Sequence, residues 1–278
     1  MGNAMADAPR IVIALDPSAP EASAFDVLRY FHGLDVDLAG VFVEDSNLLS
    51  YARSSLAREI VAGAEREVAV ESLERQLRAR SADMRRYFES VTRVVRGRHS
   101  FHVARGEVVS EIERVAANCE LLVVGVARAH RGLRARWGAD VYRLTRTRAA
   151  TTVFTRDQTP AHGVVSAVLG DVDDVAAVVP AALRIARASH ARLRVLIVAD
   201  GPGSVDAVRE RTAATLAGAE PPRYDVVADR QAATLRRAVG AAEGCTLVLA
   251  AGDDEADAEL LRELLAQTDW NVVRVRAN

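Results

Sequence analysis

The sequence contains no lysine, and all 36 of its basic residues are arginine. A phosphate-binding loop of the G-x-x-x-x-G-K-[ST] type needs its lysine to reach the β- and γ-phosphates, so that loop is excluded. Schiff-base chemistry with pyridoxal phosphate and the strand lysine of protein kinases are excluded for the same reason. No G-x-S-x-G motif marks a serine nucleophile either. We therefore expect a protein that is not an enzyme.

Cysteine and long apolar stretches are also scarce. The two cysteines, Cys119 and Cys245, form no disulfide framework and suit a reducing compartment. No apolar run approaches the roughly 20 residues that span a bilayer. A net charge of −2 gives no general attraction to nucleic acid or to an anionic membrane. The sequence therefore predicts a cytoplasmic protein that binds neither nucleic acid nor a membrane.

Short apolar runs alternate with longer amphipathic stretches, which is the pattern of βα units around a parallel sheet. The first half holds five predicted strands, at residues 11–15, 38–43, 100–104, 121–125 and 151–155. The second half repeats the series at residues 164–169, 193–198, 224–228, 247–251 and 272–275. Predicted helices begin near residues 21, 68, 108, 139, 174, 205, 232 and 258.

The two halves align with a nearly constant offset. Asp16 follows the first strand, and Asp171 follows the corresponding strand 155 residues later. The offset falls to 126 between Cys119 and Cys245, because the second half lacks the region around residues 45–75. This repeat predicts one domain that is present in two copies.

The domain boundaries follow from the repeat. A short leader or tag occupies residues 1–9, and the first domain covers residues 10–156. A polar, proline-containing linker at residues 157–162 precedes the second domain, residues 163–278. The second domain would act as an internal pseudo-dimer partner of the first. We also expect self-association or a protein partner.

Three segments of the first half resemble the universal stress protein family: a strand that ends at Asp16, a second strand that ends in residues 41–45, and a late apolar strand at residues 121–125. This resemblance implies two α/β domains, each a doubly wound, Rossmann-like, five-stranded parallel sheet with strand order 3-2-1-4-5. The ligand cleft would lie between the first and fourth strands, where the order reverses.

Members of this family that bind ATP carry G-x-x-G-x9-G-[ST] after the fourth strand. The glycines of that loop let backbone N–H groups approach the phosphates. Here Gly125 and Gly138 fill the first and third glycine positions. Arg128 replaces the second glycine, and Ala139 replaces the hydroxyl residue. Half of the motif is therefore present.

The resemblance also places Asp16 and Phe42 where the family contacts adenine and ribose. Phe42 is bulkier than the small aliphatic residue expected there and could fill the adenine position itself. The loop that follows the fourth strand is basic, with Arg131 one of several arginines between residues 128 and 136. Arginine pairs bidentately with phosphate, so charge could partly replace the missing backbone contacts.

In the second half the motif is gone. Gly252 is followed directly by Asp253, Asp254 and Glu255, and then by a predicted helix. These carboxylates occupy the favourable N-terminal end of that helix, where a phosphate would be repelled. We therefore expect no nucleotide in the second half.

Other polar groups have structural explanations. The acidic clusters at residues 171–174 and 253–255 precede predicted helices, so helix capping accounts for them without a metal. His99 and His102 would lie on opposite faces of a predicted strand. No metal site is predicted.

Together these features predict a stress-response or regulatory binding protein with a degenerate nucleotide cleft in the first half only. No resident cofactor is expected, with ATP or another adenine nucleotide as the alternative. Two other functions therefore stay open: an ATP- or AMP-binding stress protein with slow or no hydrolysis, and a protein-interaction scaffold without a small ligand.

Two structural expectations follow. The halves should superpose as two five-stranded sheets about a pseudo-two-fold axis, with residues 151–155 facing residues 272–275. The segment at residues 45–97 has no counterpart in the second half and carries alternating charges in helical phase. We expect it to form a helical lid or an interface element.

Overall fold

The computed structural model describes residues 9–15, 27–28, 35–54, 58–61, 64–67, 69–126, 143–146, 148–156, 163–198, 202–240 and 245–276. The predicted linker, most of the predicted leader and the predicted helix starts near residues 21 and 139 lie outside this part of the chain.

Ten strands of the described chain form one sheet. The first half contributes β1 (Arg10–Leu15), β2 (Asp35–Asp45), β5 (Arg96–Gly106), β6 (Leu121–Val126) and β7 (Thr151–Arg156). The second half contributes β8 (Val164–Leu169), β9 (Arg192–Val198), β10 (Arg223–Val227), β11 (Thr246–Ala251) and β12 (Asn271–Arg276). All ten coincide with the predicted strands, although β2 and β5 each run to 11 residues.

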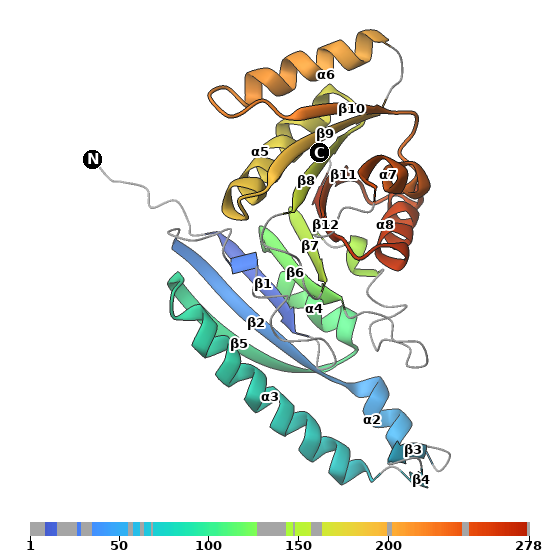
Figure 1. The fold of residues 1–278 in the computed structure, drawn as a ribbon. Helices are drawn as coiled ribbons and strands as arrows, with labels where there is room; N and C mark the ends of the chain where they lie inside the picture. Colours follow the sequence, from blue (N-terminus) through green and yellow to red (C-terminus); the bar gives the residue numbers. More distant parts are fainter. Residues whose placement is uncertain are drawn as a thin grey trace, which may run out of the picture.

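The strand order is β10-β9-β8-β11-β12-β7-β6-β1-β2-β5 (Figure 1). Each half therefore has the predicted order 3-2-1-4-5, and neighbouring strands within a half are parallel. This is the doubly wound α/β fold in two copies.

The halves join through their last strands. β12 pairs with β7 in antiparallel fashion, with Val272 opposite Phe154 and Val275 opposite Thr151. The predicted edge contact is confirmed. This ladder joins the two five-stranded sheets into one continuous sheet in which the halves are not interleaved.

The predicted offset is wrong by one residue in two of the strands. In β1, Ile11 faces the same core layer as Val165 of β8, which gives an offset of 154. In β6, Val123 shares that layer with Val248 of β11, which gives 125. A shift of one residue turns every side chain of a strand to the opposite face, so the layer decides the alignment. Asp171 is therefore the residue that caps a helix, and it does not correspond to Asp16.

Helices cover both faces of the sheet (Figure 1). One face packs against α3 (Val70–Thr92), α5 (Val172–Ala188) and α6 (Pro202–Thr215). The other packs against α4 (Val108–Ala116), the 3₁₀ turn η2 (Arg143–Arg146), α7 (Ala232–Val239) and α8 (Glu255–Gln267). Six of the described α-helices, α3 to α8, begin within three residues of their predicted starts, whereas α2 (Ser46–Ala52) was not predicted as a separate helix. None of the described helices is long and apolar enough to cross a bilayer.

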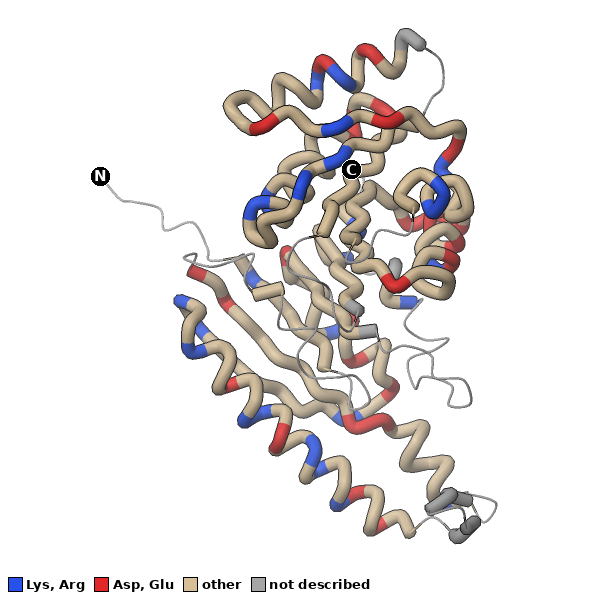
Figure 2. The backbone as a smooth tube through the Cα atoms, in the orientation of Figure 1, with Lys and Arg blue, Asp and Glu red and all other residues tan. Residues whose placement is uncertain are grey.

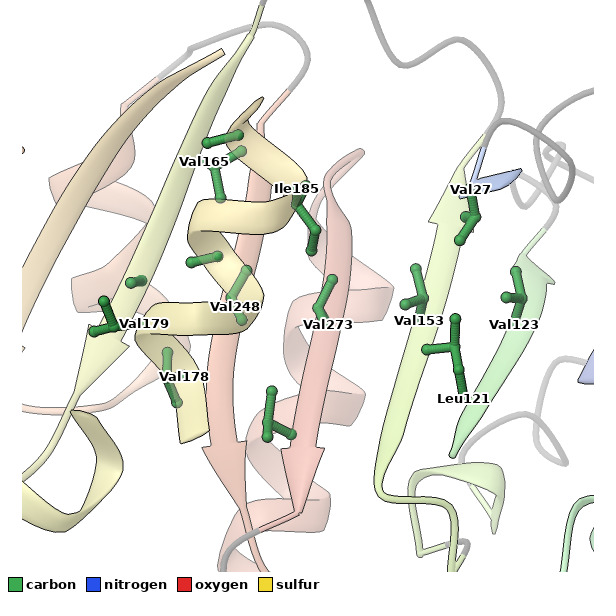
Figure 3. Close-up of a cluster of buried hydrophobic side chains, with 14 of the residues drawn as sticks. Val27, Leu121, Val123, Val153, Val165, Val178, Val179, Ile185, Val248 and Val273 are labelled. Carbon is green, nitrogen blue, oxygen red and sulfur yellow. The ribbon is translucent and has the colours of Figure 1, made fainter. Parts of the chain in front are cut away.

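Each core layer runs through both halves without a break. Successive residues of a strand point to opposite faces, so Ile11 and Ile13 lie in one layer and Val12 in the other. In the second half, Val178 of α5 packs in the same layer as Val248 (Figure 3). Because both layers include residues of both halves, the two copies share one core.

Strands β2 and β5 continue past the body of the sheet into an arm that includes α2 (Ser46–Ala52) and α3 (Figure 1). Between α2 and α3 lies a hairpin of β3 (Arg58–Val61) and β4 (Ala64–Glu67). The helical character of this segment was predicted, and the hairpin was not. Acidic and basic residues alternate along α3 (Figure 2), and two ion pairs on it join Arg78 to Glu74 and Arg86 to Asp83.

The arm packs on the sheet through aromatic rings. Phe88 of α3 is buried and lies 5.7 Å from the ring of Phe101 on β5, measured between centroids. A Cβ atom on Gly40 of β2 would lie only 2.8 Å from the Phe88 ring. Gly40 is therefore required because the ring occupies the space of its side chain.

Candidate functional site

The strand order reverses at β1 in the first half and at β8 in the second. At such a point the connections leave in opposite directions from the carboxyl ends of two adjacent strands, and ligands of doubly wound folds bind there. We call the carboxyl ends of β1 and β6 the first switch point. The carboxyl ends of β8 and β11 form the second switch point.

Gly125 of β6 lies at the first switch point, beside the carboxyl end of β1. It is buried near the end of β6, opposite Thr155 of β7. The preceding residue, Val124, pairs with Ala14 of β1. The backbone of Gly125 therefore lies near the carboxyl ends of β1 and β6, where a ligand of a doubly wound fold would meet the sheet.

Phe42 lies in the core. Its side chain is 0% exposed and belongs to the layer that contains Met84 and Phe88 of the arm. The ring thus presents no surface to solvent, and whether it takes the place of an adenine ring stays a prediction. The other candidate residues lie outside the described residues, namely Asp16, Arg128, Arg131, Gly138 and Ala139.

One ion pair of the first half joins η2 to the residue that follows β5. Glu107 follows β5 and accepts hydrogen bonds from the hydroxyl of Ser110 and from the guanidinium of Arg143 in η2. The Ser110 hydrogen bond, together with Arg143, holds the pKa of Glu107 below its usual value. This pair joins η2 to the start of α4.

At the second switch point, backbone N–H groups already donate hydrogen bonds to carboxylates of the protein. Asp171 caps α5 by accepting from the N–H groups of Asp173 and Asp174, at 2.8 and 3.0 Å. Asp174 in turn accepts from the N–H of Gly170 at 2.7 Å. Burial raises the pKa of Asp174, although the Gly170 hydrogen bond opposes that shift.

The neighbouring turn after β11 is closed in the same way. Asp257 accepts from the N–H of Gly252, and Asp254 caps α8 by accepting from the N–H of Asp257. Arg230, which follows β10, forms an ion pair with Asp257 at 3.0 Å and donates to the carbonyl of Ala250. The capping function predicted for both acidic clusters is therefore confirmed.

A buried arginine that the sequence analysis did not identify supports this turn. Arg274 of β12 is 0% exposed and donates to Asp253 at 2.8 Å and to the carbonyl of Gly252 at 3.3 Å. Burial lowers the pKa of Arg274, and the nearby Asp253 carboxylate opposes that effect. The available signal was its place inside an apolar run, since Arg274 stands between Val273 and Val275 in a strand that is buried at every position except its last.

The chemical consequence concerns anions. A phosphate bound at a switch point would accept hydrogen bonds from the N–H groups of the turns after the strands. In the second half, the N–H groups of Gly170 and Gly252 already donate to the carboxylates of Asp174 and Asp257. Two carboxylates therefore stand where phosphate oxygens would stand, and they would repel a phosphate that approached.

The structure defines a tandem α/β protein, in which two doubly wound domains share one sheet through their last strands. Among solved structures, the chain is similar to a universal stress protein from Archaeoglobus fulgidus, with a TM-score of 0.61 and 14% identity over 97% of this chain and 96% of that one. It is also similar to a putative universal stress protein from Pseudomonas aeruginosa, with a TM-score of 0.57 and 14% identity over 99% and 95% of the two chains. The chain thus has the fold of tandem universal stress proteins.

The cytoplasmic domain of a prokaryotic cation chloride cotransporter has the same architecture, with a TM-score of 0.52 and 12% identity over 96% of this chain and 94% of that one. No family model matches the sequence, and no curated protein matches it significantly. The likeness therefore extends to the fold and not to the sequence.

Proposed function

We propose that the chain is a regulatory or stress-response binding protein in which any phosphate-bearing ligand binds at the first switch point alone. The fold of universal stress proteins supports the general role. The observation that carries the proposal is the occupation of the second switch point by Asp174 and Asp257. The second domain then serves as a structural partner that completes the shared core.

The energetic argument compares a phosphate with the carboxylates already in place. To bind at the second switch point, a phosphate would have to displace hydrogen bonds to charged groups, each worth about 1.5–3 kcal/mol. Moving Asp257 aside would also break its ion pair with Arg230. The freed Arg230 would recover only part of this loss, because the carboxylates of Asp174 and Asp257 would still repel the phosphate, so binding there is disfavoured.

At the first switch point the balance differs. Gly125 places no side chain between the backbone of β6 and a ligand, and the basic residues Arg128 and Arg131 follow in sequence. Arg128 and Ala139 lack the N–H approach and the hydroxyl that the family motif supplies, so we expect weak binding and no hydrolysis. The burial of Phe42 favours a second candidate function, a ligand-free interaction scaffold, because its ring fills part of the space beside β1.

The test starts from the purified protein. We expect its absorbance spectrum and mass spectrometry of the denatured supernatant to show little or no nucleotide. Calorimetric titration with ATP should give weak binding at one site per chain, which Gly125→Val abolishes and Gly252→Ala leaves unchanged. The scaffold alternative predicts no heat at any concentration. Two occupied sites per chain would contradict both.

A further inference from the structure

The second half contains a pocket at the opposite end of the sheet from the switch points. Its volume is about 840 Å³, within the range of roughly 300–1,000 Å³ that small-molecule sites occupy. It opens at the amino ends of β8, β9 and β10, whereas Gly252 lies at their carboxyl ends. Strands of six or seven residues are about 20 Å long, so this pocket is separate from either switch point.

Local backbone structure builds the walls. After α5 the chain turns sharply at His190, whose φ of 51° is left-handed, and the N–H of Ala191 bonds to the carbonyl of Ala186 at 2.9 Å. After α6 it turns again at Gly218, with φ of 82°, where the N–H of Ala219 bonds to the carbonyl of Leu216 at 2.8 Å. The pocket lies between these two turns and is therefore formed in the absence of a ligand.

Apolar side chains form part of the lining. They come from the end of α5, the start of β9, the turn before β10 and the end of α7, namely Leu183, Ala186, Leu193, Pro221, Pro222 and Val239. An inorganic ion would leave this surface unused, whereas the carbon skeleton of an organic ligand would cover it.

The polar lining is dominated by arginine. Arg187, Arg192, Arg194 and Arg223 line the pocket together with one acidic residue, Glu220. Blue segments gather at the end of α5 and at the starts of β9 and β10 in Figure 2. Four guanidinium groups therefore face one carboxylate of the lining.

Two of these arginines are engaged by a carboxylate behind them. Asp225 accepts from Arg194 at 2.6 Å and from Arg223 at 3.1 Å. Burial tends to raise the pKa of Asp225, but these two arginines outweigh it and lower the pKa below its usual value. Arg187 and Arg192 form no ion pair with any residue that the structure describes.

The charge of the pocket is not explained by helix capping. The carboxyl end of α5 carries about half a negative charge, which a single arginine such as Arg187 would offset. With Glu220 and Asp225 counted as two negative charges against four positive ones, a positive surplus persists. That surplus is spread over α5, β9 and β10, three elements that converge on one pocket.

We propose that this pocket, the arginine pocket, binds a small organic phosphate that carries two or more negative charges. Guanidinium groups pair bidentately with phosphate oxygens, and the unpaired Arg187 and Arg192 supply the first such contacts. Arg194 and Arg223 add charge from the second side while Asp225 holds them in place. The apolar lining receives the carbon skeleton of the ligand.

The probes are fructose 1,6-bisphosphate, an organic bisphosphate, and inorganic pyrophosphate, titrated calorimetrically into the full chain. Gly125→Val serves as the background, so that binding at the first switch point does not contribute. We expect the bisphosphate to bind with one site per chain and more tightly than pyrophosphate. Arg187→Ala combined with Arg192→Ala should weaken its binding at least tenfold.

The matched control is Arg184→Ala combined with Arg211→Ala, which removes the same charge from exposed positions of α5 and α6 outside the pocket. It should change the affinity less than twofold. Because Arg187 and Arg192 are exposed, the pocket variant should keep the circular dichroism spectrum of the parent. As an independent readout, the imidazole NMR signals of His190 should shift on titration of the parent.

The proposal is overturned if the bisphosphate does not bind, if the control weakens binding as much as the pocket variant, or if the His190 signals do not move. None of these results bears on the first switch point, whose test uses ATP and Gly125. A failure there would likewise leave the arginine pocket intact.

Discussion

The two halves of the molecule share a strand order but differ at their switch points. In the second half, Asp174 and Asp257 accept the backbone N–H groups of the turns after β8 and β11. In the first half, Gly125 lies one residue before the end of β6, and the sequence that follows it carries arginines in place of these acids. The second half thus has a complete core although carboxylates accept the N–H groups of both turns.

A second difference lies on the sheet. Gly40 of β2 corresponds to Val195 of β9, and both lie in the layer that faces α3, α5 and α6. In the first half the ring of Phe88 fills the space above this position, because the long arm lies there. In the second half the valine fills that space itself. The two copies thus reach a packed core by different routes.

The largest expected effect concerns the buried Arg274. Arg274→Ala leaves a cavity and removes the partner of Asp253, so we expect the free energy of unfolding to fall by about 3 kcal/mol. Arg276→Ala is the matched control, since it removes an exposed partner of the same carboxylate and should cost at most about 1 kcal/mol. Urea denaturation measures both. Equal losses would show that burial of Arg274 contributes nothing special.

Gly40→Val should have the next largest effect. The new side chain would collide with Phe88, and overpacking of this kind costs about 1–3 kcal/mol. Combining it with Phe88→Ala should recover part of the loss, because the ring no longer occupies the space. Chemical denaturation of the two single variants and the double variant tests this coupling, and strictly additive losses would argue against it.

The positions of most elements could be predicted from the sequence, because most strands contain a short apolar run and helices α5 and α8 begin at aspartate caps. The alignment of the halves was wrong by one residue, since Asp171 and Asp16 both follow strands but Asp171 caps a helix. Matching the inward and outward positions of β1 with those of β8 would have corrected this alignment. The hairpin of β3 and β4 was missed because its residues read equally well as a helical, charge-alternating segment.

The site was predicted less completely than the fold. The glycine motif located Gly125, and the acidic clusters were recognised as helix caps. The hydrogen bonds from Gly170 and Gly252 were not predicted, because they join residues four and five positions apart whose geometry depends on the turn. Arg274 was missed because arginine on a terminal strand is usually exposed.

A smaller effect is expected in the pH dependence of the second switch point. The folded-state pKa of Asp174 is raised by burial, so the folded state binds more protons than the unfolded state between the two pKa values. Stability therefore falls as the pH rises through this window, which begins near the unfolded value of about 4. Asp174→Asn removes the titration but keeps an oxygen that can accept from Gly170.

We expect Asp174→Asn to lose this decrease in stability, whereas Asp173→Asn, an exposed neighbour in the same helical turn, keeps it. Urea midpoints for the two variants and the parent, taken in steps between pH 4 and 7, make the comparison. The account of Asp174 is wrong if both variants show the same slope as the parent.

The difference between the switch points is tested most directly by calorimetric titration with ATP of a variant whose motif is restored. Arg128→Gly combined with Ala139→Ser returns a glycine and a hydroxyl to the first half. Because each lost hydrogen bond to a charged group costs about 1.5–3 kcal/mol, the restored pair should tighten ATP binding about a hundredfold or more. The account predicts one site per chain and no effect of Gly252→Ala in the same background. A second site per chain, or a restored variant that binds no better than the parent, would contradict it.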